Sequence, residues 1–297
     1  MSIIPDDEDL PLDALREAVL QCFPDLSNAS FRKLSPGWHS SALEANESLI
    51  FKFPRSAAAV AALQREASLL QVVAPSIGTP VPRLTLHRSC RLFSRHLKLP
   101  GEQLLSDNYR QLAEAARERL AEDLARFYAE LHRLDHATLR AAGATAIEAW
   151  QPPDRIRERA LPLLPAVLRA RAEKAVWRWE KLAPDPHGLT FGYFDGHGWN
   201  FAFDHERQQL NGIYDFGDSG FGALHQEFIY SNLISRDLTV RLIRRYEELS
   251  GRDLDRERIT LLTDIHRLSE LAELADEGPQ AEAMLQQLLK WWRVSSP

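Results

Sequence analysis

The sequence predicts an α+β protein with two lobes, a small β-rich lobe followed by a larger, mainly helical lobe. Short apolar runs separated by turn residues dominate the chain up to about residue 97, and helical periodicities dominate the remainder. One β-type region interrupts the helices between residues 188 and 216. The 297 residues suffice for two lobes of this kind, which we assign to residues 1–97 and 98–297.

The first lobe is predicted to contain five strands, separated by turn residues such as Pro36, Gly37 and Asn46. The predicted strands cover residues 31–36, 41–47, 48–53, 83–87 and 90–97. One helix over residues 56–73 interrupts them, because its leucines lie in helical register before Pro75.

The second lobe begins with a periodic run of apolar residues between 112 and 134, which predicts one long helix that ends near His136 and buries one face. Further helices are predicted over residues 154–182, 225–250 and 255–294. The β-type region between them consists of residues 188–194, 200–204 and 209–216. We expect it to carry Asp195 and Asp215 into a cleft between the lobes.

Composition excludes several classes of protein. A net charge of -6 and a pI near 6.0 give no basic surface for nucleic acid and favour cationic small partners. Cys22 and Cys90 are too far apart for a disulfide framework or a cysteine zinc site, so a reducing cytoplasm is expected. The acidic N-terminus and the lack of any stretch of 18 apolar residues predict a protein that is neither secreted nor membrane-spanning. The oligomeric state is not predicted.

Two aspartates stand among aromatic and small residues, where an isolated charge is costly to bury. Asn200 follows Asp195 by five residues, and Asp215 opens the sequence DFGD after an apolar strand. Phosphoryl transfer from ATP needs such a set of groups: one carboxylate orients the acceptor hydroxyl, while an amide oxygen and a second carboxylate hold Mg²⁺ on the nucleotide phosphates.

The sequences YFDGHGWN at 193–200 and YDFGD at 214–218 resemble the H-G-D-x-x-x-x-N and I-D-F-G-D motifs of the aminoglycoside phosphotransferase family. These proteins are small-molecule kinases with a protein-kinase-like fold. Further segments, including PGWHSSALEANESLIFKFPRS and LQREASLL, extend the similarity over about residues 30–275. The resemblance therefore implies a nucleotide-binding first lobe, a catalytic and substrate-binding second lobe, and ATP and Mg²⁺ as cofactors.

The resemblance also implies roles for individual residues. Asp195 matches the catalytic carboxylate, and Asn200 and Asp215 match the magnesium ligands. Lys52 matches the lysine that contacts the α- and β-phosphates, and Glu66 matches its partner on the helix.

Other residues match the nucleotide-binding segments of the family. Ser40 and Ser41 lie where its loop closes over the phosphates. Backbone groups near the lobe junction are expected to hydrogen-bond the adenine edge, with Phe93 behind the base; these groups belong to Arg95, His96 and Leu97.

Several other polar residues have alternative interpretations. His132 and His136 have a metal-compatible spacing, but we assign them to a solvated helix end. Asp218 either supports the DFGD loop or caps a turn, and His197 is assigned a structural or substrate-side role. Glu227 and Glu273 could face a cationic substrate, but we expect both on the surface.

One departure from the family pattern affects the functional interpretation, because Tyr193 and Phe194 replace its His-Gly before the catalytic aspartate. The leading hypothesis is an ATP- and Mg²⁺-dependent O-phosphotransferase that acts on a small hydroxylated molecule, such as an aminoglycoside or another antibiotic. A second is a metabolite kinase for choline, a homoserine-like amino alcohol or a sugar. A third is a non-catalytic nucleotide-binding module, which only the Tyr193-Phe194 pair supports.

Overall fold

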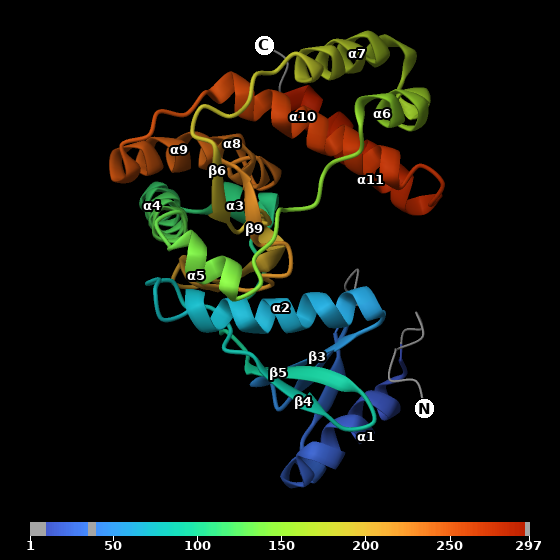
Figure 1. Cartoon of the computed structure of the whole chain (residues 1–297), viewed down its shortest axis with the longest axis vertical. Helices are drawn as coiled ribbons and strands as arrows, with labels where there is room; N and C mark the ends of the chain where they lie inside the picture. The colour runs from blue at the N-terminus through green and yellow to red at the C-terminus, as the bar shows by residue number, and fades with distance from the viewer. Residues whose placement is uncertain (1–9, 35–39, 295–297) are drawn as a thin grey trace.

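The computed structural model describes residues 10–34 and 40–294, and its N-terminal part is an antiparallel sheet of five strands in the order β1-β2-β3-β5-β4 (Figure 1). The strands are β1 (Phe31–Lys33), β2 (Ser40–Ala45), β3 (Leu49–Pro54), β4 (Thr85–Arg88) and β5 (Leu92–Leu97). All five were predicted, because their short apolar runs end at turn residues that the sequence shows directly.

The two faces of this sheet carry different helices. Helix α1 (Leu12–Cys22), followed by the short helix η1 (Pro24–Asn28), packs its buried residues against Phe51 and Phe93 on one face. Helix α2 (Ala57–Val73) lies between the sheet and the helical part of the molecule (Figure 1). The α2 helix was predicted, whereas α1 was not.

The prediction of one long helix from residue 112 to about His136 is wrong in its bounds. The structure has α3 (Ser106–Gln111), α4 (Glu114–Leu131) and α5 (His136–Ala141). The carboxylate of Asp135 accepts a hydrogen bond of 2.7 Å from the backbone N–H of Thr138, so it caps a new helix and separates α5 from α4. The predicted apolar face is nevertheless buried in the main core.

The three later helices are also divided. Residues 154–182 form α6 (Pro153–Arg159), η2 (Leu161–Leu163) and α7 (Ala166–Glu180), because Pro162 and Pro165 cannot continue a helix. Residues 225–250 form α8 (Leu224–Glu227), η4 (Tyr230–Leu233) and α9 (Arg236–Ser250). The last stretch is α10 (Arg256–Glu273) and α11 (Pro279–Val294).

The β-type region forms two ladders rather than one hairpin region. Strand β7 (Phe201–Asp204) pairs with β8 (Gln209–Ile213), and β6 (Leu189–Gly192) pairs with β9 (Gly220–Ala223), a strand that was not predicted. The loop after β6 carries Asp195 and runs into η3 (Gly198–Asn200), and the loop after β8 carries Asp215. Both aspartates therefore follow paired strands directly.

The predicted α+β class is confirmed by the antiparallel N-terminal sheet and the mostly helical remainder. The chain passes from β5 to the second part through Glu102, which exchanges two backbone hydrogen bonds with Phe203, at 2.9 and 2.8 Å. Among the helices of residues 10–34 and 40–294, none is long and apolar enough to cross a membrane.

Candidate active site

Lys52 lies at the centre of a charged cluster between the sheet and the DFGD loop. Its Nζ is 3.2 Å from Oε2 of Glu66 on α2 and 2.8 Å from Oδ1 of Asp215. Burial opposes the charge of Lys52, but the two carboxylates raise its pKa above the ordinary value, so the side chain carries a positive charge. The predicted Lys52–Glu66 pair therefore exists in this structure, and it includes Asp215.

Helix α2 also holds the loop that follows Asp215. Oε1 of the buried Glu66 accepts a 3.0 Å hydrogen bond from the backbone N–H of Phe216. The neighbouring Arg65 donates to the carbonyl oxygen of Gly217 at 3.2 Å. Two consecutive residues of one helix thus fix the position of the DFGD loop relative to Lys52.

Asp195 is held by two side chains of its own loop. Nε2 of His197 lies 2.9 Å from its Oδ1, and Nδ2 of Asn200 donates to its Oδ2 at 2.6 Å. Burial lowers the pKa of His197, but the hydrogen bond to Asp195 outweighs this and raises it above the ordinary value. The amide nitrogen of Asn200 faces Asp195, so the amide oxygen is the atom left to meet a cation.

Asn200 and Asp215 come from different loops but lie next to each other. The backbone N–H of Tyr214 donates to the carbonyl oxygen of Asn200 at 3.0 Å, which places Asp215 one residue from this contact. The side chain of Asp215 is 47% exposed, so a ligand can reach it. An amide oxygen and a carboxylate are hard donors that suit Mg²⁺.

Protein atoms alone do not complete a metal site here. Within the described residues, no group of three or more His, Cys, Asp or Glu side chains could hold a metal ion. Mg²⁺ commonly keeps only one or two protein carboxylates and completes its shell with phosphates and water. Asn200 and Asp215 fit this chemistry if a nucleotide supplies the remaining oxygens.

The backbone before Asp195 is held by Glu227, a residue that the sequence analysis assigned to the surface. That assignment is wrong: Glu227 is fully buried, and its two oxygens accept the backbone N–H groups of Tyr193 and Phe194, both at 2.9 Å. Hydrogen bonds to a charged group stabilise by about 1.5–3 kcal/mol each. They offset the left-handed backbone of Phe194 (φ 55°), a strain that costs on the order of 1–3 kcal/mol. Glu273 is exposed, as predicted.

Tyr193 joins the two functional loops. Its hydroxyl donates to the carbonyl oxygen of Tyr214 at 2.5 Å, and its carbonyl oxygen accepts a 3.4 Å hydrogen bond from Ser219. Its ring packs against Phe216, with the ring centroids 4.9 Å apart. Tyrosine at position 193 therefore connects the Asp195 loop to the strand end before Asp215.

His132 was assigned to a solvated helix end, and this assignment is also wrong. The side chain is 2% exposed, with Nδ1 2.8 Å from the hydroxyl of Tyr246 and Nε2 3.3 Å from Oε2 of Glu227. His132 therefore supports the carboxylate that holds the backbone before Asp195. A sequence separation of 95 residues left no local signal for this contact.

The predicted base-binding residues divide between the two faces of the sheet. Lys52 pairs with Ser94 on β5, and cross-strand partners share a face, so the side chain of His96 lies on the Lys52 face. The side chains of Phe93 and Arg95 point to the α1 face, where Phe93 stacks on a core phenylalanine. Burial and the charge of Lys52 lower the pKa of His96 to about 4, so its imidazole is neutral.

The remaining predicted residues lie on strands β2 and β5. Leu97 is 72% exposed at the end of β5, whereas Ser40 opens β2 and the adjacent Ser41 is fully buried in that strand. The phosphate-binding loop was predicted from PGWHSS at 36–41, and its residues 36–39 lie outside the described residues.

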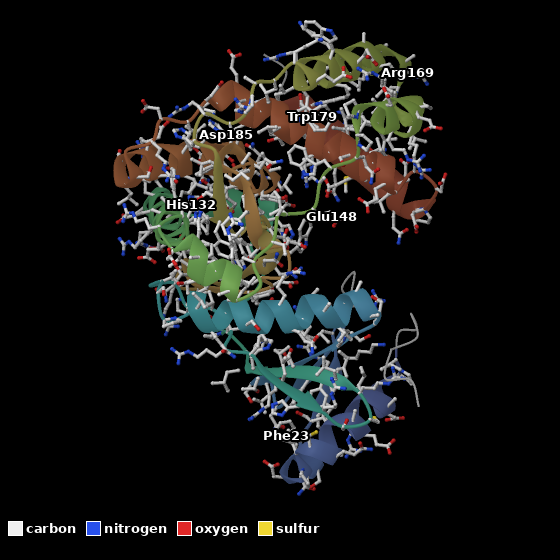
Figure 2. All side chains as sticks on the ribbon, in the orientation of Figure 1. Phe23, His132, Glu148, Arg169, Trp179 and Asp185 are labelled. Atoms are coloured by element: carbon white, nitrogen blue, oxygen red, sulfur yellow. The ribbon has the colours of Figure 1, made fainter. Side chains whose placement is uncertain are left out.

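Additional carboxylates surround Asp195. Loss of hydration at the DFGD loop and the nearby charges of Asp195 and Asp215 raise the pKa of Asp218 to about 6, although this residue is exposed. Glu148, on the irregular segment between α5 and α6, adds to the same effect (Figure 2). The side of the site beyond Asp195 is therefore negatively charged.

A β-sheet lobe with a buried lysine–glutamate pair, joined to a helical part with two acidic loops, defines a protein-kinase-like architecture. The sequence model described as the phosphotransferase enzyme family, APH, matches residues 30–261. The chain belongs to this family and is a phosphotransferase, as the motifs predicted.

Solved structures with the same fold have low sequence identity to the chain. The GDP complex of wild-type aminoglycoside 2'-phosphotransferase-IIIa has a TM-score of 0.83 at 21% identity, covering 97% of this chain and 100% of that one. The streptomycin-ATP ternary complex of APH(2")-IIa has a TM-score of 0.65 at 18% identity, covering 95% and 97%. The macrolide 2'-phosphotransferase MphH from Brachybacterium faecium has a TM-score of 0.64 at 18% identity, covering 93% and 97%. No curated protein matched the chain.

Proposed function

We propose that the chain transfers the γ-phosphoryl group of a nucleoside triphosphate, with Mg²⁺, to a hydroxyl group of a small molecule. The observation that carries this proposal is the proximity of the two loops: Asp195 and Asn200 are hydrogen-bonded to each other, and Asn200 is one backbone hydrogen bond from Tyr214, which precedes Asp215. The Lys52–Glu66 pair meets the same Asp215.

In the proposed reaction, Asp195 orients the acceptor hydroxyl and accepts its proton as the oxygen attacks the γ-phosphorus. The bond between the γ-phosphorus and the bridging oxygen breaks, and the nucleoside diphosphate leaves with the bond's electrons. Lys52 holds the α- and β-phosphates. Asn200 and Asp215 would hold Mg²⁺, which neutralises phosphate charge when it is bound.

The acceptor that the site favours is cationic. Asp218 and Glu148 add negative charge near Asp195. The named ligands of several structural neighbours are kanamycin, streptomycin and gentamicin. An aminoglycoside therefore leads our acceptor candidates, and the amino alcohol choline is the metabolite with matching charge.

A non-catalytic role is less consistent with the geometry. Tyr193 and Phe194, the only support for that hypothesis, hold the loop in place through Tyr214 and Glu227. Contacts connect Lys52 with Asp215 and Asn200 with Asp195, which supports a catalytic role, because nucleotide binding alone needs no acceptor-orienting carboxylate.

A nucleotide-consumption screen tests the proposal directly. The protein is incubated with Mg²⁺ and ATP or GTP against a panel of aminoglycosides, macrolides, amino alcohols and sugars, with Asp195→Asn as the inactive variant. Asp204→Asn is the matched control, because this carboxylate lies on β7 and holds only its own turn through the N–H groups of Glu206 and Arg207. Equal consumption by wild type and Asp195→Asn, with every panel member, contradicts the proposed chemistry.

Cellular location and lobe boundary are part of the same proposal. Cys22 and Cys90 are both free thiols, which supports a reducing cytoplasm. We propose that residues 1–97 form a nucleotide-binding lobe and that residues 98–297 form a catalytic and substrate-binding lobe.

A further inference from the structure

Phe194, the residue directly before Asp195, is held in a conformation that bulky residues rarely adopt. Its φ is 55°, in the left-handed region, and its side chain is buried at 2% exposure. The corresponding position of the family motif is a glycine, which reaches this region without strain. Specific contacts must therefore hold the phenylalanine in place.

The Phe194 ring is seated against two glycines of the β6–β9 ladder. A Cβ atom on Gly192 would lie 2.8 Å from Cε2 of Phe194, and a Cβ atom on Gly222 would lie 2.6 Å from its Cζ. Gly222 pairs with Thr190 and Gly192 with Gly220, so both glycines present the same face of the ladder. The ring fits because neither position carries a side chain.

The backbone of Phe194 is held by a hydrogen bond to Glu227, whose Oε2 would lie 1.9 Å from a Cβ atom on Gly192. The N–H of Phe194 donates to Oε1 of Glu227 at 2.9 Å, while Oε2 accepts the N–H of Tyr193. The ring contact and the backbone contact together leave one arrangement for the residue that precedes Asp195.

We propose that Phe194 is a positioning residue for phosphoryl transfer, because its ring, seated on Gly192 and Gly222, fixes the backbone from which Asp195 projects. This inference rests on the proposed catalytic role of Asp195. The packed ring restricts the backbone conformation at residue 194. This restriction matters because displacing a catalytic group by about 1 Å can cost roughly a hundredfold in rate.

The primary experiment removes the ring with Phe194→Ala. We expect turnover of the acceptor found in the screen to fall roughly tenfold to a hundredfold, with Mg·ATP affinity within about twofold of wild type because no phosphate-binding group changes. Backbone amides 193–195 should exchange with deuterium about tenfold faster, after correction for intrinsic rates. Phe203→Ala is the matched control, because Phe203 is equally buried but lies on β7.

A second variant displaces the ring without removing it. Gly222→Ala should lower turnover and accelerate exchange at residues 193–195, since its methyl group would overlap Cζ of Phe194. The same methyl would lie 2.6 Å from Cδ1 of Ile147, so Ile147→Ala is added to Gly222→Ala to relieve only that second overlap. Our inference predicts no recovery from Ile147→Ala. It also predicts that turnover in the double variant Phe194→Ala/Gly222→Ala is no lower than in Phe194→Ala alone.

The outcomes separate this inference from the proposed function. Normal turnover and normal amide exchange in Phe194→Ala overturn the positioning role, as does a Phe203→Ala control with the same loss of turnover at equal thermal stability. Recovery of Gly222→Ala by Ile147→Ala overturns it as well. If wild type phosphorylates nothing, the proposed function fails, and the exchange measurements alone decide whether Phe194 fixes this loop.

Discussion

Substituting Gly196, the residue after Asp195, tests the packing beneath the catalytic loop. A Cβ atom at Gly196 would lie 2.0 Å from the hydroxyl oxygen of Tyr128 and 3.3 Å from its Cζ. Tyr128 is fully buried, and its hydroxyl has no hydrogen-bond partner among the described residues. Gly196→Ala should therefore destabilise the protein by about 3 kcal/mol, the upper end of the usual cost of overpacking.

Removal of the hydroxyl should relieve most of this cost. In the Tyr128→Phe background, the shortest contact of the new methyl becomes the one at 3.3 Å, which a small shift accommodates. Tyr128→Phe alone should be neutral or stabilising, because a buried hydroxyl without a partner costs about 1–3 kcal/mol. We therefore expect a coupling energy of about 2 kcal/mol between the two substitutions.

Thermal unfolding of the four proteins measures this coupling. At roughly 2.1 cal/mol/K of unfolding entropy per residue, a difference of about 2 kcal/mol corresponds to roughly 3 °C in Tm for the 297 residues of this chain. Because Asp195 adjoins Gly196, turnover should fall in Gly196→Ala and recover in the double variant. A double variant that melts no higher than Gly196→Ala would refute the steric argument.

Three further predictions concern the charged groups. Asp195→Ala should largely keep Mg·nucleotide affinity but lose a hundred- to ten-thousandfold in turnover, on the order of a general-base contribution, whereas Asp215→Ala should lose both; equal losses of nucleotide affinity in titrations contradict this division. ATP or GTP with Mg²⁺ should stabilise the fold by about 2.7 kcal/mol at a hundredfold excess over Kd, and a thermal shift no larger than with Mg²⁺ alone counts against nucleotide binding. The folded pKa of Asp218, about 6, lies above its ordinary 3.8, so the folded state binds a proton more tightly than the unfolded state. The free energy of unfolding therefore falls as pH rises from 3.8 through 6. Asp218→Asn should flatten this dependence in Tm measurements between about pH 4 and 7, and an unchanged slope contradicts the raised pKa.

The parts of the fold that follow local pattern were predictable from the sequence. The strands around Lys52 and the helix of Glu66 have clear periodicity and clear end signals, so these elements were predicted from local pattern. The pairing of Lys52 with Glu66 was implied only by the resemblance to the family. Helix breaks were underestimated, because Pro162 and Pro165 lie within an otherwise continuous helical pattern.

The support of the catalytic loop was not predictable in the same way. Glu227 looks like a surface glutamate in an amphipathic segment, and the N–H groups it binds lie 33 and 34 residues earlier. The Phe194 ring contacts Gly222, which lies in a strand that was not predicted at all. Such contacts arise from tertiary structure and leave no spacing that a single sequence reveals.

The contact between Lys52 and Asp215 has a consequence for the order in which ligands bind. The ammonium group of Lys52 lies 2.8 Å from a carboxylate oxygen of Asp215, which is also the candidate metal ligand. A free divalent cation arriving first would meet a positive charge at close range, with no phosphate to neutralise it. The enzyme should therefore capture Mg²⁺ and nucleotide as one preformed complex, and initial-rate kinetics should depend on the concentration of that complex rather than on free Mg²⁺.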